Sequence, residues 1–141
     1  MARADALLDR YGTHHRNPVN KAVHWVCVPL IVWSVAGLLW SATPVAAFVA
    51  LGAALAFYVW LSMSIALGMV VVLAAMLYAL SWLGDRTLVV SASVFVAAWI
   101  GQFIGHAIEG SRPSFAEDVR SFLIAPAWLL AFVYRRLGIP Y

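Results

Sequence analysis

The stretch SATPVAAFVALGAALAFYVWLSMSIALGMVVVLAAMLYALSWLG, residues 41–84, contains no charged residue. It is too long and too apolar for one element of a soluble protein. It is long enough to cross a hydrocarbon core of about 30 Å twice. Ser62 and Ser64 form a weak polar break near its middle. We therefore expect two membrane-spanning helices here, at about residues 43–61 and 64–83.

Two further apolar segments flank this stretch. The first starts at Asn17-Pro18, where asparagine caps a helix and proline fits its first turn, and it predicts a span over about residues 18–40. The second predicts a span over about residues 88–108. The chain is 65% hydrophobic and 11% charged, with a mean hydropathy of +0.91. We interpret residues 1–141 as a single all-α integral membrane domain with about four transmembrane helices.

The two ends of the chain predict helices that lie on the membrane instead of crossing it. Residues 2–11 place apolar side chains on one face, and Gly12 stops that helix, so we expect a surface helix. Residues 115–136 follow a capping box from Ser114 to Glu117. Their last apolar run is interrupted by Pro126 and is too short to span, so we expect an interfacial or re-entrant segment.

Basic residues predict the orientation of the spans. Most of them precede the first span or follow the fourth, which places the N-terminus in the cytoplasm. An even number of spans then brings His24 and His106 to a similar shallow depth on the same side. The net charge of +3 is too small and too dispersed to indicate a nucleic-acid partner. No secretory signal peptide is recognisable, so we expect an integral protein of the cytoplasmic membrane in a prokaryote or of the endoplasmic reticulum in a eukaryote.

The histidines are the candidate metal ligands. Three imidazoles from separate segments, namely His24, His106 and either His14 or His15, are predicted to form the site. Imidazole suits iron, zinc and copper, and the single cysteine excludes a site built from several thiolates. Polar neighbours at helical spacing, which could orient a ring or complete the ligand set, are Asn20, Gln102 and Glu109.

Composition leaves several functions open. A mononuclear metal enzyme, a zinc-dependent membrane hydrolase and a small lipid-binding membrane protein with a structural metal all fit the pattern. A di-iron histidine-box enzyme needs more histidines than the four present. Transport is disfavoured because the two central spans and the break between them carry no charged residue, and their only serines are Ser62, Ser64 and Ser81. The oligomeric state stays open.

Two motifs resemble a known family. Residues 11–29, YGTHHRNPVNKAVHWVCVP, and residues 99–113, WIGQFIGHAIEGSRP, closely resemble the paired motifs of the fungal 2-hydroxy fatty acid dioxygenases, the Mpo-type membrane proteins. The resemblance implies a membrane-embedded Fe(II) dioxygenase. It would use O₂ to convert a long-chain 2-hydroxy fatty acid to the acid one carbon shorter.

The resemblance also implies which residues act. It matches His15, in preference to His14, together with His24 and His106 as ligands, and it includes Glu109 as ligand, base or ion-pair partner. Asn20 and Gln102 are expected to support the rings. A fatty acid would keep its carboxylate at the headgroup level and its tail in the bilayer. Basic residues expected to offset that carboxylate are Arg16, Lys21 and Arg112.

Overall fold

The part of the chain that the structure describes, residues 2–13, 15–112 and 120–141, is built from helices and short turns. In this computed structural model the elements are, in chain order, α1 (Ala2–Gly12), α2 (Pro18–Ala42), α3 (Pro44–Leu61), α4 (Met63–Ser81), the short 3₁₀ turn η1 (Gly84–Arg86), α5 (Thr87–Glu109) and α6 (Ser121–Leu137). Among the described residues, four segments are long and apolar enough to cross a membrane: Pro18–Ala42, Pro44–Leu61, Met63–Ser81 and Gly84–Glu109. The predicted all-α membrane protein with about four spans is confirmed.

Single residues join the first three of these spans. Thr43 separates α2 from α3, and Ser62 separates α3 from α4; both have extended backbone. Their hydroxyls accept hydrogen bonds from the N–H groups of Val45 and Ile65. Each hydroxyl thus satisfies a donor in the first turn of the following helix. The weak break predicted at Ser62 is therefore a sharp turn between two helices.

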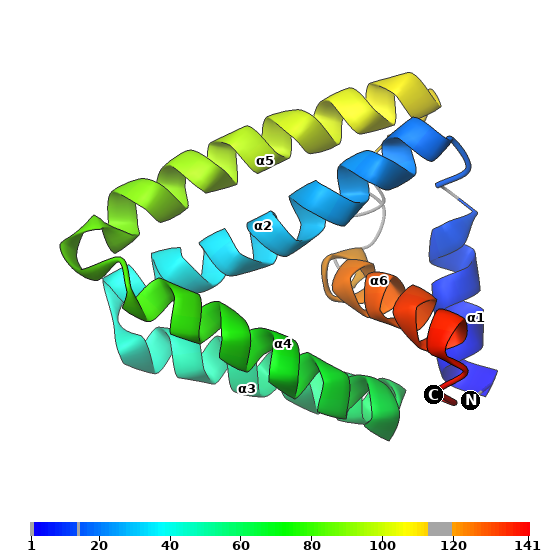
Figure 1. Cartoon of the computed structure of the whole chain (residues 1–141), viewed down its shortest axis with the longest axis horizontal. Helices are drawn as coiled ribbons and strands as arrows, with labels where there is room; N and C mark the ends of the chain where they lie inside the picture. Colours follow the sequence, from blue (N-terminus) through cyan, green and yellow to red (C-terminus); the bar gives the residue numbers. More distant parts are fainter. Residues whose placement is uncertain (1, 14, 113–119) are drawn as a thin grey trace.

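The helices form two antiparallel pairs that diverge from a common end (Figure 1). One pair is α2 with α5, and the other is α3 with α4. The pairs meet where Thr43 and η1 connect them, and they spread apart toward the opposite end. Asn17, Ser62 and Glu109 all lie at this open end because successive spans alternate in direction. His24 and His106 therefore lie at the same end of the molecule, as the even number of spans predicted.

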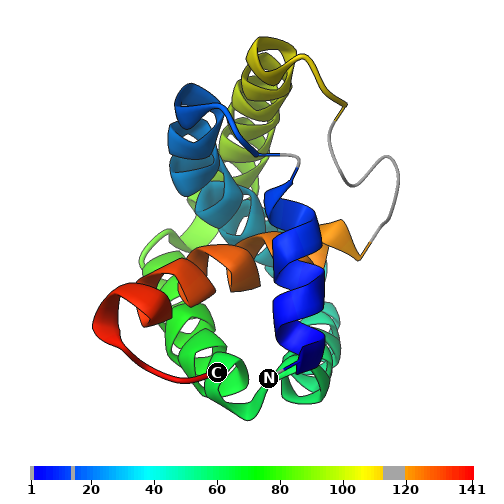
Figure 2. The same ribbon diagram turned by 90° about the vertical axis from the view of Figure 1, so that its right-hand side faces the viewer.

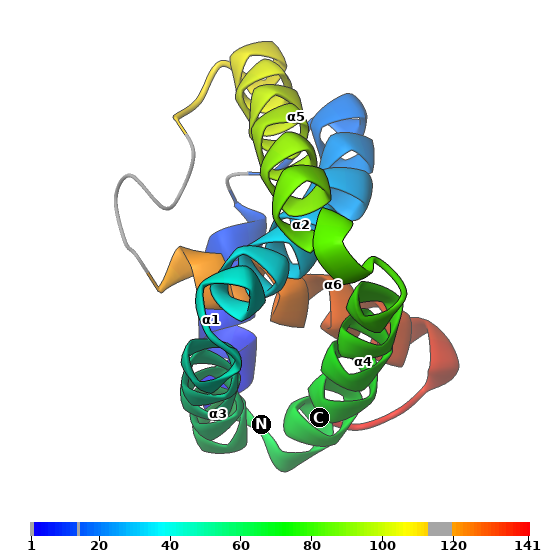
Figure 3. The ribbon, with the colours of Figure 1, turned by 90° about the vertical axis from the view of Figure 1, so that its left-hand side faces the viewer.

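The short helices α1 and α6 occupy the space between the two pairs at the open end (Figures 2 and 3). Buried side chains of α1, α3, α4 and α6 form the main apolar core there, including Leu8, Tyr58, Met69 and Ala127. The Tyr58 hydroxyl donates to the backbone oxygen of Leu123, at 3.0 Å, and so ties α3 to α6. These contacts hold α6 against the spans.

The predicted terminal segments differ from α1 and α6 in detail. α6 continues through Pro126, so the expected interruption there was wrong. Proline lacks an N–H group, but a helix tolerates this loss when neighbouring groups re-satisfy the backbone. The predicted capping box from Ser114 to Glu117 lies outside the described residues. Among the described residues α6 is not one of the four candidate spans.

Glycines on α5 allow the close contact between α2 and α5. A Cβ built at Gly101 would lie 2.7 Å from the Cys27 sulfur, and one built at Gly105 would lie 2.6 Å from Oδ1 of Asn20. Real Cβ atoms do not approach other atoms so closely. The GxxxG spacing of Gly101 and Gly105 therefore serves close helix packing. This packing places His106, the neighbour of Gly105, beside α2.

Candidate metal centre

His15 lies in the short connection between α1 and α2. Its ring is completely buried and stacks on Tyr11, with ring centroids 4.4 Å apart and an interplanar angle of 21°. Its Nδ1 lies 2.9 Å from the backbone oxygen of Tyr11. A backbone carbonyl can only accept, so His15 donates from Nδ1. The unprotonated Nε2 of this tautomer then faces the interior of the site.

His24, one turn after Asn20 on α2, repeats this arrangement. Its ring is 1% exposed, and its Nδ1 lies 2.9 Å from the backbone oxygen of Asn20. Its Nε2 lies 2.8 Å from Nε2 of His15. Both Nδ1 atoms are occupied as donors, so two neutral rings would turn two lone pairs toward each other. A cation at the site relieves that repulsion.

His106 on α5 supplies the third imidazole. Its ring centroid lies 5.0 Å from that of His24 and 5.4 Å from that of His15, and its side chain is buried. One ligand atom from each of the three residues falls within 4.8 Å of the others. Three buried imidazoles at this spacing are able to hold a divalent cation. The structure thus groups the histidines that the sequence analysis selected.

Glu109, at the last position of α5, contacts the start of α2. Its Oε1 accepts from the backbone N–H of Arg16 at 3.0 Å, and both carboxylate oxygens accept from that of Asn17, at 3.0 and 2.9 Å. Its Oε2 also accepts from Nδ2 of Asn20 at 3.1 Å. A carboxylate at a helix N-terminus is stabilised by these donors and by the helix dipole. Among the described residues, the group that could hold a metal ion consists of the three histidines and does not include Glu109.

The two predicted supporting amides are both buried. Asn20 provides the carbonyl that holds His24, and its side chain lies between Glu109 and Gly105. Gln102 lines the cavity beside His24 and His106. Gln102 of α5 thus lies beside the histidines, whereas the Asn20 side chain contacts Glu109 and only the Asn20 backbone carbonyl contacts a ring.

The remaining predicted residues lie elsewhere. His14 falls outside the described residues. The three basic residues expected to meet a carboxylate are Arg16, Lys21 and Arg112. All three are exposed, and none of them lines the cavity beside the histidines.

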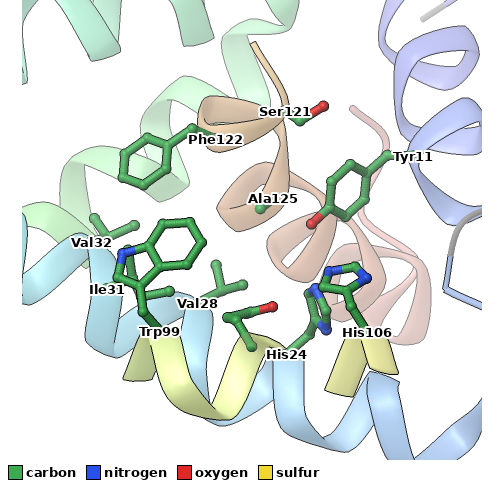
Figure 4. A pocket seen from close by; sticks show the side chains of 11 residues that line it. Tyr11, His24, Val28, Ile31, Val32, Trp99, His106, Ser121, Phe122 and Ala125 are labelled. Carbon is green, nitrogen blue, oxygen red and sulfur yellow. The ribbon is translucent and has the colours of Figure 1, made fainter. Parts of the chain in front are cut away.

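A small cavity opens beside the imidazoles, and we call it the histidine pocket. It has a volume of about 40 Å³. Figure 4 shows Tyr11, His24 and His106 at one end and Trp99 with Phe122 toward the other. Its walls are mostly apolar, and the side chains of the three histidines are buried.

Sequence reasoning did not select Tyr11 and Trp128 as site residues. Tyr11 stacks on His15, and the Trp128 ring centroid lies 5.6 Å from both Tyr11 and His15. Burial raises the pKa of the Tyr11 phenol, so its hydroxyl keeps its proton. The four-residue spacing of Tyr11 and His15 is a signal that could have suggested their contact. Nothing in the sequence places Trp128 of α6 beside α1.

A comparison with protein families gives one match across nearly the whole chain. The family model described as 2-hydroxy-palmitic acid dioxygenase Mpo1-like matches residues 1–137. No curated protein and no solved structure matches significantly.

Proposed function

The chain belongs to the Mpo1-like family, and we propose that it is a membrane-embedded Fe(II)-dependent dioxygenase. Its substrate would be a long-chain 2-hydroxy fatty acid, and its product the fatty acid one carbon shorter. The observation that carries this proposal is the 2.8 Å contact between Nε2 of His15 and Nε2 of His24, with both Nδ1 atoms already bound to carbonyls. That donor set is suited to a metal ion.

His15, His24 and His106 would hold the iron. Fe(II), when bound, would supply reactivity toward O₂ and affinity for the hydroxyl and carboxylate oxygens of the substrate. Carbonyl oxygens of Tyr11 and Asn20 fix two of the rings in the tautomer that ligation needs. The same rings are buried, which keeps water from competing at the site.

The residues around the histidines are proposed to hold the metal ligands and the substrate in place. Glu109 links the last turn of α5 to the first turn of α2 through three N–H donors, so it fixes His106 relative to His24. We propose this positioning role for Glu109, although the sequence pattern also allows a ligand or base. Asn20 and Gln102 are proposed to orient the rings and the substrate oxygens.

The exposed basic residues are proposed to act at longer range. Arg16, Lys21 and Arg112 would attract the substrate carboxylate to the open end. This end would face the cytoplasm, in the cytoplasmic membrane or the endoplasmic reticulum according to the cell.

The overall reaction balances with one molecule of O₂. The substrate loses four electrons when its second carbon becomes a carboxyl group and its first carbon leaves as CO₂. O₂ accepts those four electrons, and the remaining product is water. No reductant or further oxidant is required.

Anaerobic purification followed by elemental analysis tests the proposal. We expect about one iron per chain and O₂ uptake with 2-hydroxy-palmitic acid but not with palmitic acid, the matched control without the hydroxyl. Stoichiometric zinc without O₂ uptake would favour the hydrolase alternative. A protein that binds lipid but shows neither turnover nor O₂ uptake would favour the lipid-binding alternative, even if it held a structural metal.

A further inference from the structure

A second cavity adjoins the histidine pocket, and we call it the apolar cavity. Val32 of α2 and Phe122 of α6 line both cavities. In Figure 4 these two side chains lie away from Tyr11 and the histidines, toward the other end of the histidine pocket. The apolar cavity continues from this neck among α2, α3, α4 and α6 and has a volume of about 160 Å³. It is the larger of the two cavities.

The walls of the apolar cavity offer nothing to a polar occupant. Among its described lining residues only Tyr58 carries a polar side-chain group, and that hydroxyl already donates to the Leu123 carbonyl. Small side chains such as Ala36, Ala47 and Ala54 leave the space open. An empty apolar cavity costs stability in proportion to its volume, and water finds no hydrogen-bond partners in it. The occupant that fits is therefore a hydrocarbon.

The lining residues of the two cavities extend along α2 over a distance close to the depth of one leaflet. Val28 lines the histidine pocket, and Leu39 lines the far part of the apolar cavity on the same helix. The helical rise between them is about 16 Å. Half of a hydrocarbon core of roughly 30 Å, the depth that one leaflet fills, is about the same.

We propose that the acyl chain of the substrate binds inside the protein, in the apolar cavity, instead of remaining in the bilayer. This inference rests on the proposed function. The carboxyl end lies at the histidines, the chain passes between Val32 and Phe122, and the methyl end reaches Leu39 and Ala47. These last two residues line the cavity and lie four positions before and after the Thr43 turn, so in this proposal they set the longest chain accepted.

Chain-length profiles of two opposite variants test the cavity. Ala47→Leu narrows the cavity near the Thr43 turn, so turnover of 2-hydroxy-palmitic acid should fall about tenfold or more relative to 2-hydroxy-decanoic acid. Leu39→Ala enlarges the same part of the cavity and should raise the relative turnover of 2-hydroxy-arachidic acid about threefold or more. Because Leu39→Ala predicts a gain, a folding defect cannot imitate it. Ala53→Leu is the matched control for Ala47→Leu, because Ala53 is an exposed position on the same helix, α3. It should leave the profile unchanged.

A binding measurement separates this inference from the proposed reaction. Palmitic acid with a photoreactive diazirine at its methyl end is added to the full-length protein in nanodiscs under anaerobic conditions. Crosslinks at Leu39 and Ala47 that disappear in Ala47→Leu support the cavity even if no oxidation is ever found. Crosslinks confined to lipid-facing Val45 and Val49, which are 68% and 67% exposed, would overturn it. So would turnover with chain-length profiles identical in all variants.

Discussion

Small residues have different effects at two contacts of α2, one with α5 and one with α3. Between α2 and α5, Gly101 and Gly105 let the helices approach until Cys27 and Asn20 fill the space where a Cβ would stand. On α3, Ala47 and its neighbours leave a gap against α2 that no side chain fills. The contact between α2 and α5 is therefore close and contains polar groups, whereas the contact between α2 and α3 leaves the apolar cavity. The close contact lies beside the buried imidazoles, and the looser contact holds the apolar cavity.

Removing one of the three histidines should have the largest effect on metal binding and turnover. His15→Ala, His24→Ala and His106→Ala each leave two imidazoles, so we expect loss of stoichiometric metal and turnover below detection. Elemental analysis and O₂ uptake measure both. Ser91→Ala, a buried polar residue farther along the same helix pair, is the control and should keep its metal. Full activity in any histidine variant would remove that residue from the ligand set.

A Cβ at the helix contact should have the next largest effect. In Gly105→Ala the new atom would meet Oδ1 of Asn20 at 2.6 Å and Cγ1 of Val23 at 3.0 Å. Asn20 is held by Glu109, so α5 must shift, and we expect a loss of about 1–3 kcal/mol together with weaker metal binding. Thermal unfolding in detergent and metal retention during dialysis are the measurements.

Gly52→Ala, at an exposed position of α3, is the matched control. No atom lies within 4 Å of its would-be Cβ, so alanine should gain up to about 1 kcal/mol from helix propensity. Equal destabilisation by Gly105→Ala and Gly52→Ala would contradict the close contact of Gly105 with Asn20 as the cause.

Glu109→Gln tests the link between α5 and α2 at a smaller scale. An amide cannot accept from all three N–H donors, so we expect about 1–3 kcal/mol of destabilisation, with metal still bound. Asp85→Asn, which removes a charge from exposed η1, is the control and should change little. Metal loss as complete as in the histidine variants would instead identify Glu109 as a ligand.

Neutralising the exposed basic residues should have the smallest effect. For Lys21→Gln and Arg112→Gln we expect the KM for 2-hydroxy-palmitic acid to rise by less than about fivefold, because exposed charges contribute little and are screened by salt. Steady-state kinetics at low and high ionic strength measure this. Arg86→Gln, at the opposite end of the molecule, should leave KM unchanged. A large kcat effect would indicate that a basic side chain reaches the reacting atoms.

Local signals in the sequence determined the spans and their ends. The uncharged stretch, the Asn17-Pro18 helix start and the serine break each act over a few residues, and helix capping and hydrocarbon thickness are local constraints. Counting the spans was then enough to place His24 and His106 at the same end. The motif spacing selected His15, and the structure places it against His24.

Only the tertiary structure decided what surrounds the histidines. The position of α6 between the helix pairs brings Trp128 to His15 and Phe122 to the mouth of the apolar cavity, and no local pattern encodes that position. The contact of Glu109 with the start of α2 joins residues at opposite ends of the sequence. Hydropathy and periodicity report which face of a helix is apolar. How far apart two helices pack depends on the side chains of both. The close contact of α2 with α5 and the apolar cavity were therefore decided only by the fold.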